Sequence, residues 1–126
     1  FGIYTFNTVH QMITTIQSRL AEKYHFTEAL KTTFPMGSMT GAPKPRAMQL
    51  IEEHENFARN LYAGAVGYIT PQGDFDFNVV IRSLFYNAES HYLSARVGSA
   101  ITIHCDVEQE YQECLLKADN LFSCLR

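Results

Sequence analysis

Residues 106–126, DVEQEYQECLLKADNLFSCLR, carry the clearest structural signal in the chain. Asp106 is a candidate helix N-cap, and Gln109 stands three residues later, as in a capping box. Apolar residues then recur at helical spacing: Tyr111, Cys114, Leu115, Ala118, Leu121, Phe122 and Leu125. This pattern predicts an amphipathic helix that runs to the end of the sequence.

The stretch before this helix is typical of β-structure. Apolar, aromatic and alternating residues are interrupted twice by turn residues, first by Pro71-Gln72-Gly73. The expected elements are a strand over 61–70, a turn at 71–73, a strand over 74–86, a turn at 87–90 and a strand over 91–103. Arg82 is expected on the second of these strands and Gly98 inside the third.

Helices and one further β-segment are expected upstream. Residues 5–20 fit helical spacing but are rich in β-branched side chains, so we favour a strand. Thr27 is a candidate cap for a short helix, residues 34–42 form a loop, and a helix follows from Pro43 to about Glu55. The order predicts an α+β fold in which an antiparallel sheet packs with helices.

Composition excludes several classes of protein. The 126 residues are 46% hydrophobic and 18% charged, which fits one globular domain and argues against disorder. The formal charge of −3 gives no electrostatic basis for binding nucleic acid, and no apolar run reaches the roughly 20 residues of a membrane helix. The absence of a basic-then-apolar leader and the three cysteines without a CxxC pair predict reduced thiols and a cytoplasmic location.

One group of candidate site residues lies on the last helix. Glu110, Glu113 and Lys117 fall within a stripe about 60° wide at the border of the apolar face. Two carboxylates beside one ammonium suit a hard cation such as Mg²⁺ next to an anionic substrate. The alternative is a solvated helix face with a Glu113–Lys117 pair, which is the more common arrangement for this spacing.

Other candidates are weaker when taken alone. The loop Gly37-Ser-Met-Thr-Gly-Ala-Pro-Lys44 before a helix is either an anion site or an ordinary helix start, and it lacks P-loop spacing. Arg82 is expected to have a carboxylate partner from the protein or from a ligand. Gly98 permits close approach of a ligand or marks a bulge, and His10 by itself is more typical of a core or surface position.

Four ordered stretches together carry a resemblance. They are FPMGSMTGAPKPRAM (34–48), RNLYAGAVGY (59–68), DFNVVIRS (76–83) and DVEQEYQECLLKA (106–118). They resemble the chorismate-utilising enzymes, which include aminodeoxychorismate synthase component I, anthranilate synthase component I and isochorismate synthases. The variants present look most like the aminodeoxychorismate branch. The match covers about Val9 to the last residue and corresponds to the C-terminal half of the family's domain.

The resemblance implies roles for nine residues at matching positions. Glu110 and Glu113 match metal-site glutamates for Mg²⁺, and Lys117 follows them as a substrate-binding lysine. The remaining matches are Tyr62, Arg82 and Gly98 for substrate carboxylates, Ser38 and Thr40 for loop hydroxyls facing the substrate, and His10 for a histidine near the reacting ring.

The resemblance also implies an activity. We expect residues 1–126 to be a single partial chorismate-binding domain whose upstream half is not in this chain. The expected parent is a Mg²⁺-dependent enzyme that aminates chorismate for 4-aminobenzoate and folate biosynthesis, with a glutamine amidotransferase subunit or free ammonia as nitrogen source. The segment alone is expected to be inactive, with neither nucleic acid nor membrane as partner.

Departures from the family pattern leave alternatives open. Ser99 and Ala100 stand where the family continues with glycines, and a positive φ at Ala100 would be strained. Asn60 also replaces a glycine, but Asn tolerates the left-handed region. The alternatives are anthranilate synthase component I, a degenerate chorismate-binding module without turnover, and a structural or interaction domain.

Overall fold

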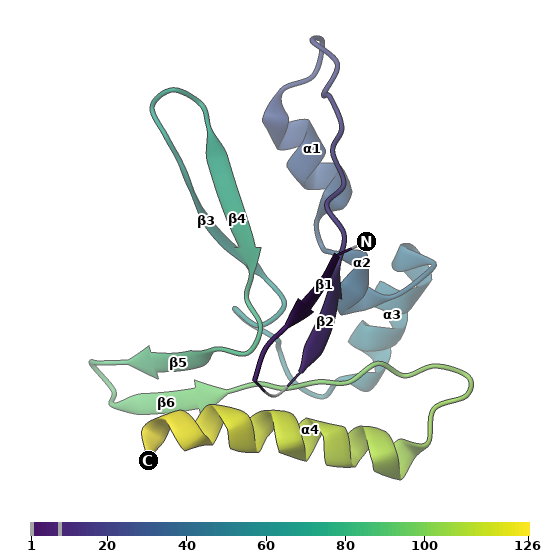
Figure 1. Ribbon diagram of the computed structural model, residues 1–126, viewed down its shortest axis with the longest axis vertical. Coiled ribbons are helices and arrows are strands. Elements are labelled where there is room, and N and C mark those ends of the chain that lie inside the picture. The colour runs from purple at the N-terminus through teal and green to yellow at the C-terminus, as the bar shows by residue number, and fades with distance from the viewer. Residues whose placement is uncertain (1, 8) are drawn as a thin grey trace. The chain divides into compact units, whose positions relative to one another are not determined.

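The computed structural model describes residues 2–7 and 9–126 (Figure 1). The described chain combines helices with antiparallel strands, which confirms the α+β class. It divides into two compact units, residues 1–37 and 38–126, and each is described by itself. None of the helices among the described residues is long and apolar enough to cross a membrane.

The first unit holds a β-hairpin and one helix. Strands β1 (Gly2–Thr5) and β2 (His10–Ile13) pair antiparallel, so part of residues 5–20 is a strand, as expected. Helix α1 (Phe26–Thr33) is capped by His25, whose Nδ1 accepts from the Thr27 backbone N–H at 3.5 Å. The predicted cap at Thr27 was therefore wrong.

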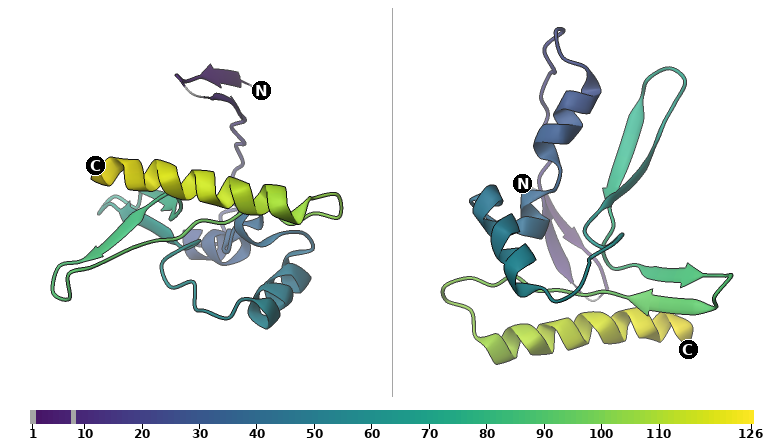
Figure 2. Two further views of the ribbon diagram at one scale, coloured as in Figure 1. Left: turned by 90° about the horizontal axis from the view of Figure 1, so that it is seen from below. Right: turned by 180° about the vertical axis from the view of Figure 1, so that it is seen from behind.

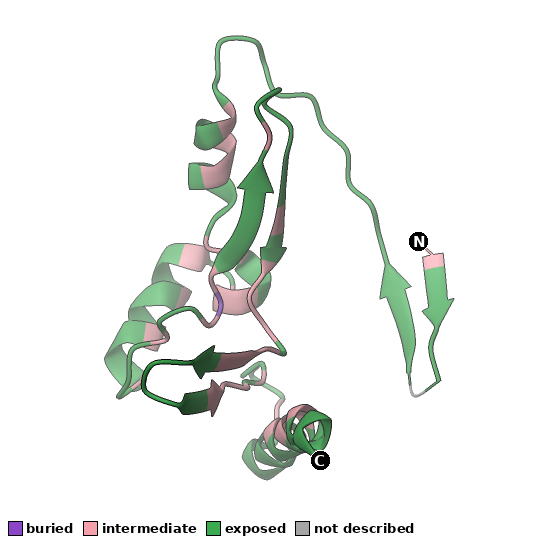
Figure 3. Ribbon diagram, turned by 90° about the vertical axis from the view of Figure 1, so that its left-hand side faces the viewer, coloured by how far each residue is buried: buried purple, intermediate pink, exposed green. Residues whose placement is uncertain are grey.

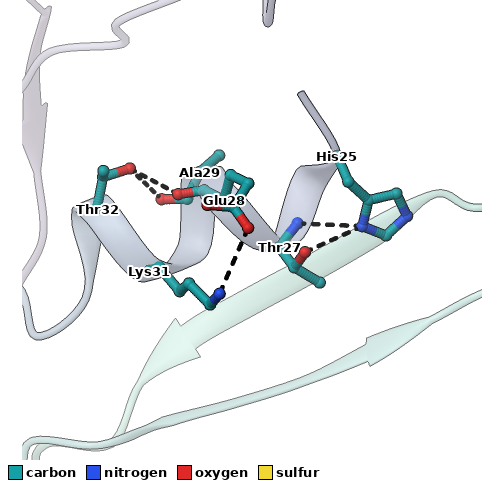
Figure 4. Close-up of polar contacts among 6 residues, drawn as sticks. All are labelled: His25, Thr27, Glu28, Ala29, Lys31 and Thr32. Carbon is teal, nitrogen blue, oxygen red and sulfur yellow. Dashed lines mark hydrogen bonds and ion pairs between the residues drawn. The ribbon is translucent and has the colours of Figure 1, made fainter. Parts of the chain in front are cut away.

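Side chains within α1 bond to its own backbone and to each other (Figure 4). The Thr32 hydroxyl donates to the carbonyl oxygens of Glu28 and Ala29 at 2.8 and 3.0 Å. Lys31 Nζ lies 3.4 Å from a Glu28 carboxylate oxygen. The Glu28–Lys31 pair adds a little stability to a helix that has no buried residue.

Two helices follow, the first of which begins at Gly37, the last residue of the first unit, and otherwise belongs to the second unit. Helix α2 (Gly37–Thr40) forms a single turn within the stretch that was predicted to be a loop. Helix α3 (Lys44–His54) has Pro43 as N-cap and Glu55 as C-cap, which agrees with the predicted helix to within one residue at each end. Pro43 and Pro45 are tolerated at this helix start because the first N–H groups have no partner inside the helix.

Two further hairpins follow in the second unit. Strands β3 (Ala65–Ile69) and β4 (Phe75–Val79) pair antiparallel, and Gly73 closes their turn with φ +93°. Strands β5 (Leu84–Asn87) and β6 (Tyr92–Ala95) pair likewise. The strands are shorter than predicted, and those described form three separate two-stranded ladders rather than one meander.

Helix α4 (Val107–Phe122) and a 3₁₀ turn, η1 (Ser123–Leu125), complete the chain. Asp106 caps α4 by accepting from the Gln109 N–H at 2.9 Å, as predicted. Figure 2 shows the segment that follows β6 running alongside α4. The helix face nearest this segment is half-buried and includes Glu110 and Lys117, whereas much of the predicted apolar face is exposed, including Tyr111, Leu115, Phe122 and Leu125.

Burial is low over the whole described chain (Figure 3). Ala63, at 8% exposure, is the only buried hydrophobic residue among positions 2–7 and 9–126. It takes φ +64°, and its N–H donates to the Val80 carbonyl oxygen at 3.0 Å. Many large apolar side chains are exposed, such as Ile103 at 93% and Ile16 at 88%, so the chain presents apolar surface of the kind that packs against other structure.

Candidate functional site

Three of the candidate residues lie along α4, where helical spacing and the Asp106 cap set their positions. Glu113 and Lys117 are four residues apart, and their Oε1 and Nζ atoms are 2.5 Å apart. The hydrogen bond from Lys117 lowers the pKa of the Glu113 carboxyl. Glu110 is half-buried, one turn earlier. The Glu113–Lys117 ion pair that the alternative interpretation, a solvated helix face, predicted is therefore present.

The segment after β6 is tied to α4 at two points. The Ser99 hydroxyl donates to Glu110 Oε2, and Lys117 Nζ donates to the Gly98 carbonyl oxygen at 3.0 Å. Gly98 lies outside any strand, because β6 ends at Ala95. The strand predicted over 91–103 was therefore wrong for residues 96–103. Ala100 does not take the positive φ that would strain it, whereas Asn60 does take the left-handed region, with φ +53°.

Arg82 lies in a bend between β4 and β5, not on a strand as predicted. Its φ of +50° interrupts the extended backbone, and the Ser83 hydroxyl donates to the Ile81 carbonyl oxygen at 2.8 Å in the same bend. Arg82 and Lys117 line a cavity of about 100 Å³ together with Asn120 and Leu121. This volume is below the roughly 300 Å³ at which small-molecule pockets begin.

Tyr62 and Gly98 are neighbours in space. A Cβ atom added at Gly98 would lie 2.8 Å from the Tyr62 hydroxyl oxygen, which is closer than side chains normally approach. Glycine at position 98 therefore allows Tyr62 to reach the backbone at this point. The close approach that was predicted for Gly98 is made here by the protein's own side chain.

Ser38 and Thr40 lie on α2, on either side of Met39. The Met39 carbonyl oxygen accepts a hydrogen bond from Arg59 Nη1 at 3.0 Å. Gly41 follows with φ +129°, a conformation that L side chains rarely adopt, and the chain then turns into α3. A hydrogen bond from the Arg59 side chain to the backbone thus ties down the short helix that carries the two candidate hydroxyls.

Arg59, which makes this contact, was not predicted as a site residue. Arg59 also binds the Glu55 carboxylate, with Nε and Nη2 2.7 and 2.5 Å from its two oxygens. This bonding to Arg59 lowers the pKa of Glu55 and raises that of Arg59. The available signal was the i,i+4 spacing of opposite charges, but Arg59 lies beyond the end of α3, where helical spacing gives no expectation of contact.

His10 belongs to the first unit and is described apart from the other eight candidates. It is exposed on β2, opposite Thr5, whose Oγ1 lies 3.1 Å from His10 Nδ1. This contact accounts for one ring nitrogen. The assignment of His10 to a reacting centre stays a prediction.

Glu110 and Glu113 are the residues predicted to hold a metal ion. Among residues 2–7 and 9–126, no three His, Cys, Asp or Glu side chains gather in a group that could hold a metal ion. Carboxylate oxygens are nevertheless the ligands that Mg²⁺ prefers, and Mg²⁺ commonly keeps several waters and binds through one or two carboxylates plus substrate. The two glutamates fit that donor chemistry, with the remaining positions left to water or substrate.

Six candidates are linked by contacts in the second unit. Lys117 contacts Glu113 and Gly98 and shares a cavity with Arg82, while Tyr62 reaches Gly98. Glu110 joins through Ser99, next to Gly98. We call these residues the α4 site: Tyr62, Arg82, Gly98, Glu110, Glu113 and Lys117. It contains two cationic side chains, Arg82 and Lys117, and two carboxylates, Glu110 and Glu113.

Comparison with known proteins shows the family. The family model described as chorismate binding enzyme matches residues 1–123, nearly the whole chain. The chain therefore belongs to the chorismate-binding enzyme family, as the four sequence stretches predicted.

Curated relatives match the chain over a small part of their own length. Aminodeoxychorismate synthase of Streptomyces pristinaespiralis is 40% identical over 100% of this chain, which spans 17% of that protein. Aminodeoxychorismate synthase component 1 of Salmonella typhimurium is 38% identical over 96% of this chain, which spans 26% of that protein. Anthranilate synthase component 1 of Aquifex aeolicus is also 38% identical, over 98% of the chain, with 24% of its length spanned.

Proposed function

We propose that this chain is part of a chorismate-aminating enzyme most like aminodeoxychorismate synthase component I. The observation that carries the proposal is the α4 site, where Arg82 and Lys117 line one cavity and Glu113 bonds Lys117. The similarity to two aminodeoxychorismate synthases supports the same branch. The similar identity to an anthranilate synthase component 1 makes anthranilate the alternative product.

Chorismate carries two carboxylates, which suits a site with two cationic side chains. The Arg82 guanidinium can grip one carboxylate with two parallel hydrogen bonds, a geometry that a planar fork provides. Lys117 adds a second positive charge at the same cavity. These side chains would orient the substrate without changing its bonds.

The two glutamates are the proposed Mg²⁺ ligands. When bound by Glu110 and Glu113, Mg²⁺ would neutralise the ring carboxylate of the substrate and withdraw electron density from the ring. Both carboxylates are held in place, one by Ser99 and the other by Lys117. Lys117 therefore has two proposed tasks, to orient Glu113 and to attract the substrate anion.

The proposed reaction replaces a ring hydroxyl by an amino group. Ammonia forms the new C–N bond at C4, the hydroxyl leaves with a proton as water, and the enolpyruvyl group stays attached. Ser38, Thr40 and His10 are the proposed groups near the reacting ring. A glutamine amidotransferase subunit or free ammonium supplies the nitrogen. Folate biosynthesis and a cytoplasmic location, the latter based on the three free cysteines, belong to the same proposal.

A chimera tests this proposal, because the chain spans only part of its relatives. Residues 1–126 replace the matched segment of the Salmonella protein, and the chimera is incubated with chorismate, Mg²⁺ and ammonium. We expect aminodeoxychorismate by mass spectrometry; anthranilate instead would assign the other branch. Formation of neither product by a folded chimera would refute the enzymatic proposal.

Two substitutions in the chimera locate the chemistry. Glu113→Gln keeps the size of the side chain but removes the charge, and it should reduce product formation by at least about a hundredfold. Glu89→Gln is the matched control because Glu89 lies in the β5–β6 turn, where only its backbone N–H bonds, to Asn87. Equal losses in both variants would show that charge on the chain, not the α4 site, is what matters.

A binding module without turnover is the second candidate function. The observation that favours it is that both glutamates already bond to side chains of this chain, Glu110 to Ser99 and Glu113 to Lys117. Titration of the chimera with chorismate in a calorimeter separates the two functions. Tight binding without product would favour the binding module, and restoration of turnover by Ser99→Gly would identify the bond to Glu110 as the cause.

A further inference from the structure

An ion pair outside the α4 site is the best-formed one in the described chain. Glu55 and Arg59 make two charge-assisted hydrogen bonds in fork geometry, at 2.7 and 2.5 Å. Their side chains are 28% and 24% exposed, whereas those of the Glu113–Lys117 pair are 53% and 34% exposed. Partial burial strengthens such a pair relative to an exposed one, because less water and salt screens it.

The same arginine reaches back to α2. Its third nitrogen, Nη1, donates to the Met39 carbonyl oxygen at 3.0 Å, twenty residues earlier in the sequence. Met39 lies between Ser38 and Thr40, so the bond holds the backbone that presents both hydroxyls. The Glu55 carboxylate in turn fixes the plane of the guanidinium and so the direction of Nη1.

Two further contacts are made by residues of this region, one by Arg59 and one by Arg96. The Arg59 carbonyl oxygen accepts from the Tyr62 N–H at 3.0 Å. The Arg96 guanidinium lies 4.8 Å from the centroid of the Phe57 ring, and its charge helps to lower the pKa of Glu55. Arg96 stands two residues before Gly98. We call Glu55, Phe57, Arg59 and Arg96 the Glu55 cluster.

We propose that the Glu55 cluster is a positioning device that holds α2, and with it the Ser38 and Thr40 hydroxyls, in place through the Arg59–Met39 bond. The substrate roles of those hydroxyls rest on the proposed function. Arg59 touches α2 through the Met39 carbonyl oxygen and acts on the substrate only through this helix. Because misplacement of a reacting group by about 1 Å can cost about a hundredfold in rate, loss of the cluster should lower kcat/KM strongly.

The first test asks whether Arg59 holds α2. Backbone hydrogen exchange of residues 37–41 is measured by mass spectrometry in the 126-residue chain without ligand. Arg59→Lys keeps the positive charge but cannot make the fork and the Met39 bond together. It should accelerate exchange in this segment at least about tenfold, and unchanged exchange would overturn the proposal. Arg46→Lys, in the exposed Arg46–Glu53 pair of α3, is the matched control and should leave that exchange unchanged.

A charge reversal separates positioning from plain stability. Combining Glu55→Arg with Arg59→Glu restores opposite charges, but a carboxylate at position 59 cannot donate to the Met39 carbonyl oxygen. We expect the double variant to recover most of the thermal midpoint that Arg59→Glu alone loses, yet to keep fast exchange in residues 37–41. Recovery of slow exchange together with stability would overturn the positioning role.

Activity in the chimera completes the test. Arg59→Lys and the reversed pair should lower kcat more than they raise KM, while Arg46→Lys should change neither. Full activity in both variants would overturn the proposal. If the unsubstituted chimera forms no product, the proposed function fails, and the exchange measurements still decide on the Glu55 cluster.

Discussion

The contact between Tyr62 and Gly98 allows a quantitative prediction. In Gly98→Ala the new Cβ would lie 2.8 Å from the Tyr62 hydroxyl oxygen, whereas ordinary contacts begin near 3.4 Å. The hydroxyl must therefore move by about 0.6 Å. Overpacking costs about 1–3 kcal/mol, and we expect the lower end, about 1 kcal/mol, because Tyr62 is only half-buried and the ring can tilt. The next ring atom is 3.8 Å away, so removal of the hydroxyl should remove the conflict.

A double-mutant cycle measures this contact. Urea unfolding and chorismate affinity are compared for the unsubstituted chimera, Gly98→Ala, Tyr62→Phe and the combination. We expect Gly98→Ala to cost about 1 kcal/mol in the Tyr62 background and close to nothing in the Phe background, a coupling of about 1 kcal/mol. The affinity for chorismate should fall in Gly98→Ala. An equal cost in both backgrounds would refute the reasoning, because the hydroxyl would then play no part.

Three further predictions concern stability and are checked by chemical or thermal unfolding of the 126-residue chain. Glu55→Gln should remove about 1.5–2 kcal/mol near neutral pH, the lower range for a hydrogen bond to a charged group, because the pair is a quarter exposed. The pKa of Glu55 is lowered in the folded state. Its contribution to the free energy of unfolding is therefore present above the unfolded pKa of about 4.3 and is lost as pH falls through the folded pKa. If the stability of Glu55→Gln fell with pH in the same way as that of the unsubstituted chain, this reasoning would be contradicted. Asp106→Ala should cost about 1 kcal/mol by removing the cap of α4, while Asp106→Asn should cost far less. Gly41→Ala should cost about 1–3 kcal/mol, since φ is +129° and the new Cβ would lie 3.0 Å from that of Ala47, and a neutral effect would show that this turn relaxes freely.

The elements that could be predicted are those whose signals are local. Asp106 and Gln109 define the start of α4 because the capping bond lies within four residues. The helix from Pro43 was predicted for the same reason, since proline at a helix start is a short-range preference. The turn at residues 71–73 was found because Gly73 supplies the positive φ that it requires.

The elements that could not be predicted depend on backbone angles that side-chain type does not reveal. Arg82 and Ala63 take positive φ, which is rare for both residue types, and the bend at Arg82 separates β4 from β5. The alternation of apolar and polar residues alone predicted that the strand extends through residue 82. The apolar face of α4 was predicted to be its buried face, and this was wrong in part. Ser99 and Gly98 instead hydrogen-bond to Glu110 and Lys117 beside the apolar stripe.

In the candidate site, too, short-range contacts were predicted and long-range contacts were not. Helical spacing predicted the Glu113–Lys117 contact, which is local. The bond from Arg59 to Met39 spans twenty residues and has no sequence signature, so Arg59 was not among the predicted residues. Long-range backbone contacts of this kind appear only once the fold is known.

The most direct test of the central claim is a calorimetric titration of chorismate into the chimera, with and without Mg²⁺. The claim is that Glu110 and Glu113 bind the cation while Arg82 and Lys117 bind the substrate anion. We predict binding that tightens at least about tenfold with Mg²⁺ in the unsubstituted chimera, and no such dependence in Glu113→Gln. The same Mg²⁺ dependence in both proteins would contradict the account.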